Sequence, residues 1–138
     1  MLKGADYLHG KGIIHRDIKG SNFLIGNDGV VKYCDFGLAR LVDKNKIALT
    51  SRVITRWYRA PELFLGDNFY DEKVDIWSIG CVFVELVTNG VPIFKGESDE
   101  DIIRLIGARL PFPKAEEWPG LDKLPNYASL KTSLYSYH

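Results

Sequence analysis

The sequence HRDIKGSN at residues 15–22 decides the fold, together with two shorter motifs that follow it. DFG occupies residues 35–37 and APE occupies residues 60–62. Between the first two motifs, residues 23–33 read FLIGNDGVVKY, in which two apolar runs flank Gly-Asn-Asp-Gly. An Asn-Asp-Gly turn supplies the positive φ angles that a tight reversal between strands requires. The pattern therefore predicts a short β-hairpin that joins the first motif to the second.

Two later stretches predict helices. Residues 71–88 are apolar on nearly every side, which predicts a buried central helix. Ser98 lies three residues before Asp101, and this capping-box pattern precedes an amphipathic run. A second helix is therefore expected over about 99–109.

The remaining stretches carry weaker signals. Residues 1–11 have helix-compatible apolar positions and end at glycines, so the chain opens in or near a helix. Residues 41–59 show little periodicity and many polar side chains, which indicates a long surface loop. After Leu110, prolines at positions 111, 113, 119 and 125 predict extended segments.

Composition argues against several classes of protein. Lys plus Arg and Asp plus Glu each number 18, so no overall charge attracts the chain to nucleic acid or to a membrane surface. The longest apolar stretch, near residues 76–87, is interrupted by Ser78 and Glu85 and is too short to span a bilayer. The two cysteines show no disulfide or metal-ligand spacing, and the first residues do not resemble a secretion signal. An intracellular protein is expected.

Two carboxylates and an amide within these motifs suit phosphoryl transfer. Its loose transition state needs a nucleophile placed in line and phosphate charge neutralised, with little covalent help from the protein. Asp17 is the candidate that orients a substrate hydroxyl or accepts its proton. Asp35 and Asn22 offer the hard oxygen ligands that Mg²⁺ prefers beside phosphate oxygens. Each motif alone would fit an ordinary turn or surface group, so their order along the chain carries the interpretation.

In this order the three motifs resemble the signature of eukaryotic serine/threonine protein kinases. The resemblance implies a protein kinase-like α+β fold, of which this chain is the mainly α-helical C-terminal lobe with a short β-hairpin. It implies transfer of the γ-phosphate of ATP, with Mg²⁺, to protein hydroxyl groups. Asp17 and Lys19 would be catalytic; Lys19, Asn22 and Asp35 would bind the cofactor, and Asn22 and Asp35 the metal. Lys19 also indicates Ser or Thr, rather than Tyr, as the acceptor.

VITRWYRAPE at residues 53–62 and DIWSIG at residues 75–80 resemble the cyclin-dependent kinases, most of all the transcription-associated ones. This likeness implies protein substrates with Pro after Ser or Thr, a cyclin-like regulatory subunit, and residence in the nucleus, with the cytoplasm as the alternative. The substrate pocket would be formed by Val53, Ile54, Thr55 and Arg59. Arg56 stands where relatives usually carry Leu, and we interpret it as a tolerated variation.

The same resemblance places a regulatory phosphorylation site at Thr50. A phosphate there would add about 1.5 to 2 negative charges near Arg16 and Arg40, the family phosphate partners that are present. Charge-assisted hydrogen bonds to these arginines could order the loop. Ser51 is the neighbouring alternative, and an unmodified surface threonine is the simpler one.

Residues 1–138 would then be a partial kinase domain, with the catalytic loop at 15–22 and the activation segment at 35–62. No glycine-rich loop and no strand lysine in a VAIK context precedes residue 15. We therefore expect the N-terminal lobe, which carries the main cyclin-docking surface, to be absent and the isolated chain to transfer phosphate poorly or not at all. The alternative is a non-catalytic scaffold or decoy that binds a cyclin-like partner or a kinase substrate.

Glu62 resembles a glutamate that, in kinases, pairs with a buried arginine near the end of the domain. No arginine follows Arg109 in this sequence. Because an unpaired buried charge costs about 3 to 5 kcal/mol, we expect marginal stability.

Overall fold

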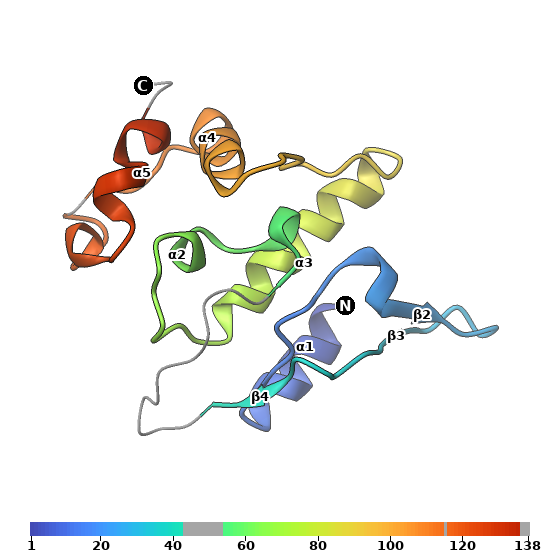
Figure 1. Ribbon diagram of the computed structural model, residues 1–138. Helices are drawn as coiled ribbons and strands as arrows, with labels where there is room; N and C mark the ends of the chain where they lie inside the picture. The colour runs from blue at the N-terminus through green and yellow to red at the C-terminus, as the bar shows by residue number, and fades with distance from the viewer. Residues whose placement is uncertain (43–53, 115, 136–138) are drawn as a thin grey trace.

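The computed structural model describes residues 1–42, 54–114 and 116–135, and helix α3 runs through its middle (Figure 1). The helices are α1 (Leu2–Gly10), α2 (Pro61–Phe64), α3 (Lys73–Val87), α4 (Asp99–Arg109) and α5 (Tyr127–Leu134). The strands are β1 (Ile13–Ile14), β2 (Phe23–Ile25), β3 (Val31–Tyr33) and β4 (Arg40–Leu41), and short 3₁₀ turns are η1 (Gly20–Asn22), η2 (Arg56–Tyr58) and η3 (Leu121–Lys123). α1 and the hairpin lie on one side of α3, and α2, α4 and α5 lie on the other.

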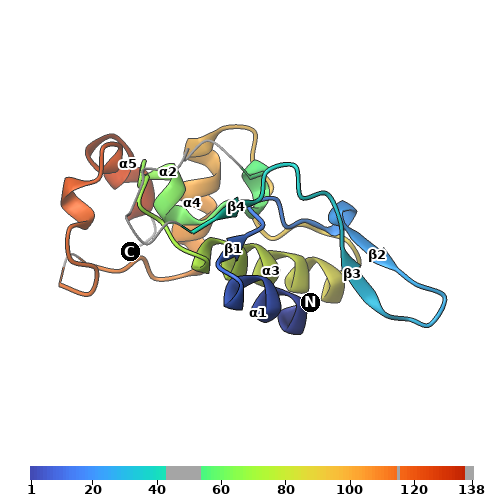
Figure 2. The same cartoon turned by 90° about the horizontal axis from the view of Figure 1, so that it is seen from below.

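The predicted hairpin is confirmed. β2 and β3 pair antiparallel with Phe23 opposite Tyr33, and Gly29 takes the left-handed turn position with φ 74°. Figure 2 shows the hairpin projecting away from the helices. A second ladder, not predicted from the sequence, pairs β1 with β4 and places the strand that leads into residues 15–22 beside the strand that follows DFG.

Helix α3 lies where a helix was expected, but the prediction of all-round burial is wrong for the described residues. Val74 and Val82 are buried, together with Ile79. Phe83 and Leu86 on another face are largely exposed, because no described segment packs over them. α3 is therefore a core helix on one side and an apolar surface on the other.

The C-terminal part contains one helix that the sequence analysis missed. Ser98 and Asp101 form the predicted capping box at the start of α4. The expectation of extended chain after Leu110 is wrong for α5, because the last proline, Pro125, lies just before that helix and leaves its amides free to bond. α4 and α5 pack closely, with Leu134 buried between them.

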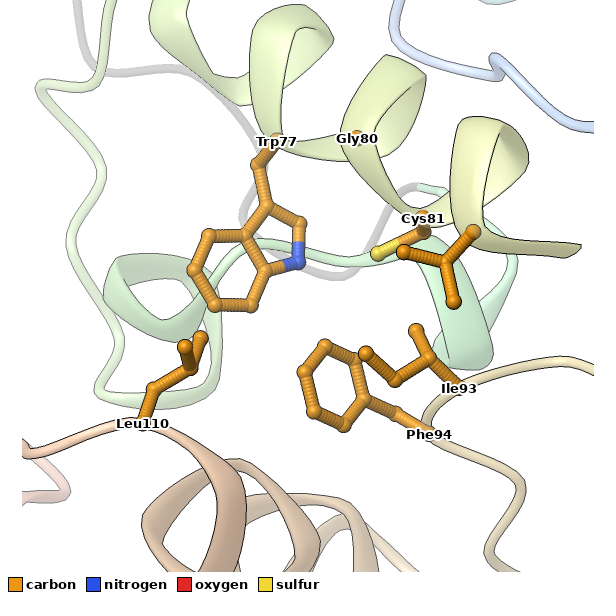
Figure 3. A pocket seen from close by; sticks show the side chains of 7 residues that line it. Trp77, Gly80, Cys81, Ile93, Phe94 and Leu110 are labelled. Atoms are coloured by element: carbon orange, nitrogen blue, oxygen red, sulfur yellow. The ribbon is translucent and has the colours of Figure 1, made fainter. Parts of the chain in front are cut away.

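An apolar pocket of about 260 Å³ lies between α3 and the C-terminal end of α4 (Figure 3). Trp77, Cys81, Phe94 and Leu110 contribute to its wall, and burial raises the pKa of the Cys81 thiol to about 12. None of the residues expected to act in catalysis lines it. Among the described residues, no helix is long and apolar enough to cross a membrane.

Candidate active site

One buried carboxylate holds the backbone of residues 15–22. Asp75, on α3, accepts hydrogen bonds from the backbone N–H of His15 (2.8 Å) and of Arg16 (2.9 Å). His9 Nε2, on α1, lies 2.9 Å from the same carboxylate. These contacts stabilise Arg16 in a left-handed conformation with φ 65°, which turns the loop. The sequence analysis missed His9, because nothing local connects it to a partner 66 positions away.

The imidazole of His15 connects this loop to the DFG motif. Its Nδ1 accepts the backbone N–H of Asp17 (3.2 Å), so its Nε2 carries the proton and donates to the carbonyl of Cys34 (3.1 Å). The N–H of Cys34 donates to the carbonyl of Asn22 (3.0 Å). Asp35 therefore follows a residue whose backbone is fixed at both ends by the loop.

The structure brings three of the predicted site residues together around the carboxylate of a fourth, Asp17. Asn22 Nδ2 donates to Asp17 Oδ2 (2.9 Å), and Lys19 Nζ lies 3.2 Å from the same oxygen. Thr55 Oγ1 donates to Asp17 Oδ1 (3.2 Å) and accepts from Lys19 Nζ (3.0 Å). Thr55 comes from the segment before APE, so this contact joins the catalytic loop to the segment expected to bind substrate.

The contacts keep Asp17 ionised. Burial alone would raise the pKa of its carboxyl, but the hydrogen bond and positive charge of Lys19, with hydrogen bonds from Asn22 and Thr55, hold that pKa below its ordinary value. A carboxylate held in this way is a weak base with a fixed orientation. It is suited to orienting a hydroxyl group and to receiving its proton late in the reaction.

Asn22 and Asp35 offer a donor set that fits Mg²⁺ held jointly with phosphate. Asn22 uses its Nδ2 to donate to the carbonyl and to the side chain of Asp17, which turns its amide oxygen away from those bonds. Asp35 is exposed, and one of its oxygens accepts the N–H of Gly37 (3.2 Å). Among the described residues no group of three His, Cys, Asp or Glu side chains could hold a metal alone. A magnesium ion here would need oxygens from a nucleotide.

The segment before APE is strained at one position. Ile54 is buried and has φ 71°, a left-handed conformation that a β-branched residue rarely adopts. Its carbonyl oxygen accepts a hydrogen bond from Arg59 Nη2 (3.1 Å). Of the four residues expected to form a substrate pocket, Ile54, Thr55 and Arg59 lie in this segment, and Val53 falls outside the described residues.

The expected phosphorylation site, Thr50, also lies outside the described residues. Of its two expected partners, Arg16 is buried and donates to the carbonyl of Leu38 (2.7 Å) and to the hydroxyl of Tyr70 (2.9 Å). Arg40 is exposed and donates to a neighbouring backbone carbonyl. The phosphorylation of Thr50 stays a prediction.

Glu62, in α2, takes part in none of the ion pairs found among the described residues. Burial, followed by the nearby charges of Asp67 and Asp71, raises the pKa of its carboxyl. The carboxyl lines a pocket of about 290 Å³ that also contains Lys73.

Comparison with known proteins decides the family. The model of the protein kinase domain matches residues 1–131. The chain belongs to the protein kinase family. Within this family it resembles cyclin-dependent kinase D-1 of Arabidopsis thaliana (46% identity over 92% of this chain) and the CTD kinase subunit alpha of Schizosaccharomyces pombe (48% over 95%). These similarities place it with the transcription-associated cyclin-dependent kinases, as the sequence motifs indicated.

Solved kinase structures support the fold. The yeast RNA Pol II CTD kinase CTDK-1 complex matches 94% of this chain with a TM-score of 0.86 and 44% identity. The CAK complex from Chaetomium thermophilum bound to ATP-gamma-S matches 97% with a TM-score of 0.83 and 39% identity. This chain spans 32% of the Arabidopsis kinase and 42% of the CTDK-1 chain. The expected kinase-like α+β fold, helix-rich with a small hairpin, is confirmed.

Proposed function

We propose that this chain supplies the catalytic loop, residues 15–22, and the substrate-binding segment, residues 54–59 directly before APE, of a cyclin-dependent-type serine/threonine protein kinase. The observation that carries the proposal is the joint contact of Lys19, Asn22 and Thr55 with the carboxylate of Asp17. We further propose a cyclin-like regulatory subunit, a nuclear location and phosphorylation at Thr50. Similarity to the CTD kinase subunit alpha and to the two solved complexes supports the regulatory subunit and the nuclear location. The phosphorylation site is proposed from the position of Thr50, five residues before Thr55.

In the proposed phosphoryl transfer, residues of this chain orient the acceptor hydroxyl and balance the negative charge of the phosphate. Asp17 accepts a hydrogen bond from the acceptor hydroxyl and takes its proton as the oxygen attacks phosphorus. Lys19, 3.2 Å from Asp17, is placed to balance negative charge on the transferred phosphoryl group. Asn22 and Asp35 would hold Mg²⁺ on ATP, and the ion would neutralise phosphate charge. Thr55 keeps Asp17 and Lys19 in register with the bound substrate.

We propose that the substrate carries Pro directly after the phosphorylated residue. The left-handed backbone of Ile54 directs its carbonyl toward Arg59 Nη2, which takes one of its two lone pairs, so this carbonyl is a poorer acceptor for an N–H from that substrate position. A substrate residue with an N–H would lose a hydrogen bond to water without replacement, which costs about 1 to 3 kcal/mol. Pro has no N–H to lose. The preference can be tested with peptides that carry Pro, Ala or N-methylalanine at this position, because N-methylalanine also lacks the N–H.

The kinase proposal is tested with a fusion protein. The part of the S. pombe CTD kinase subunit alpha that precedes its matched region is joined to Met1 of this chain, and transfer of labelled phosphate from ATP to a Ser-Pro peptide is measured. We expect transfer by the fusion, a loss of about 10²- to 10⁴-fold in D17N, and little or none by the chain alone. A folded fusion that binds ATP but transfers no phosphate would contradict the proposal and favour a scaffold or decoy.

A further inference from the structure

The substrate-binding segment is fastened to the start of α4 by several side chains. Arg56 Nε donates to Asp99 Oδ1 (2.8 Å), and its Nη1 donates to the carbonyl of Glu97. Trp57 Nε1 donates to the carbonyl of Gly96 (2.9 Å). Arg56, which the sequence analysis interpreted as a tolerated variation, therefore makes specific contacts with another element.

Asp99 contacts two arginines of this segment at once. Its Oδ1 also lies 3.6 Å from Arg59 Nη1, and the Arg59 guanidinium lies 5.0 Å above the ring of Phe64. Arg59 is largely buried, whereas Asp99 and Arg56 are about half exposed. The carboxylate of Asp99 thus lies beside one end of a guanidinium whose other end is packed inside the protein.

Arg59 connects Asp99 to Ile54, one of the residues of the proposed substrate pocket. Its Nη1 faces Asp99, while its Nη2 donates to the carbonyl of Ile54. Because a guanidinium is rigid and planar, a carboxylate that attracts one of its nitrogens also influences the direction of the other. The strained backbone of Ile54 is therefore coupled to the first residue of α4.

The geometry points to Asp99 as a positioning residue that sets the preference for Pro after the phosphorylated residue, acting through Arg59 and the carbonyl of Ile54. This inference rests on the proposed function. If the carboxylate is lost, Arg59 is held less well, and the carbonyl of Ile54 becomes a better acceptor for an N–H from the substrate. Substrates with Ala at that position should then bind nearly as well as substrates with Pro.

Neighbouring carboxylates of α4 have other partners. Glu100 accepts a hydrogen bond from Ser133 Oγ on α5 (3.1 Å). Asp101 closes the capping box with Ser98 and pairs with Arg104 (2.9 Å). Glu100 therefore provides a matched control, since it lies next to Asp99 and carries the same charge without contacting the substrate-binding segment.

The test measures binding of fluorescent peptides, with Ser followed by Pro, Ala or N-methylalanine, to the 138-residue chain and its variants. For the wild type we expect tighter binding of the Pro and N-methylalanine peptides than of the Ala peptide. D99N should reduce this preference about three- to fivefold, the range expected from exposed ion pairs. D99E should restore part of it, R56Q should keep most of it, and E100Q should leave it unchanged. An unchanged preference in D99N would overturn the inference.

A second readout separates this inference from the proposed function. The amides of Tyr58 and Arg59 donate to the carbonyls of Thr55 and Arg56 within the segment, so their hydrogen exchange reports its rigidity. D99N should exchange about three- to fivefold faster at these amides than E100Q. If the wild type shows no preference for Pro, the proposed substrate class is wrong. Amide hydrogen exchange alone then tests the contact between Asp99 and Arg59. Equal exchange in D99N and E100Q would show that Asp99 does not position the segment.

Discussion

At the scale of single residues, the side chain of Thr55 has an unusual position. Its hydroxyl donates to Asp17 and accepts from Lys19, so one oxygen orients both an expected base and an expected cation. A hydroxyl can do both, whereas a methyl group of the same size can do neither. The arrangement of Asp17 and Lys19 therefore depends on a third residue, Thr55.

Thr55→Val tests this dependence in the fusion kinase. Because the substitution keeps the shape and removes hydrogen bonds to charged groups, kcat/KM for the Ser-Pro peptide should fall by about tenfold or more. The pKa of Asp17 should move up, toward its ordinary value, because one of the hydrogen bonds that lowers it is lost. T132V, on the exposed surface of α5, is the control. Equal rates for T55V and T132V would contradict the prediction.

The raised pKa of the Glu62 carboxyl leads to a prediction about the pH dependence of stability. Its folded pKa is raised above the ordinary value of 4.5, so the folded chain binds this proton more tightly than the unfolded chain does. The resulting stability is fully present below the unfolded pKa and is lost as the pH rises through the folded pKa. E62Q should therefore melt at a higher temperature than the wild type at pH 7, and this difference should shrink as the pH approaches 4.5.

Thermal melts of the wild type, E62Q and E116Q over this pH range provide the check. Glu116 is exposed, so its substitution controls for the general loss of one carboxylate. A wild type more stable than E62Q at pH 7 would mean that Glu62 has a stabilising partner, as the corresponding glutamate of kinases does with its arginine.

At the scale of elements, the contact between α4 and α5 depends on a glycine. A Cβ added to Gly107 would collide with the backbone carbonyl of Leu134, which cannot move without displacing α5. Gly80, in α3, faces open space, although it too lies inside a helix. The two glycines have the same helix propensity and opposite surroundings.

We therefore expect G107A and G80A to change stability in opposite directions. G80A should stabilise the chain by about 0.5 to 1 kcal/mol, because Ala favours helix over Gly. G107A should destabilise it by about 1 to 3 kcal/mol, as overpacking does. Urea unfolding followed by circular dichroism measures both. A stabilising G107A would show that α5 does not pack against α4 in solution.

The elements also show what the sequence could and could not predict. The hairpin followed from Asn-Asp-Gly, and α4 followed from Ser98 and Asp101, because these signals are local. The β1–β4 ladder joins residues that are 26 and 28 positions apart, so no local pattern predicts it. Likewise Asp17, Lys19 and Asn22 share one short motif, whereas the contacts of His9 and Asp99 depend on the tertiary fold.

At the scale of the whole molecule, α3 organises both halves of the site. Asp75, near its start, holds the catalytic loop. Ser78, one turn later, donates to the carbonyl of Tyr58 (2.7 Å), and Glu85 accepts from the hydroxyl of Tyr58 (2.7 Å). Residues 15–22 and the segment before APE are therefore both bonded to the same helix, which positions Asp17 and Thr55 relative to each other.

The two faces of α3 should respond differently to substitution. Val82 is 2% exposed and Phe83 is 60% exposed, although they are adjacent and both apolar. Val82→Gln places an amide in the core and removes apolar contacts, so it should cost about 2 to 5 kcal/mol. Phe83→Gln should change stability by less than about 0.5 kcal/mol, the range of ordinary surface substitutions.

Phe83→Gln should also reduce self-association, because Phe83, Leu86 and Val87 leave a large apolar surface open on this face. Sedimentation velocity over a range of protein concentrations measures association, and urea unfolding measures stability. If F83Q destabilises the chain as much as V82Q does, the outer face of α3 is covered in solution, which would contradict the prediction. If only V82Q unfolds the chain, the buried face of α3 alone stabilises the fold, and the position of Asp17 depends on that face.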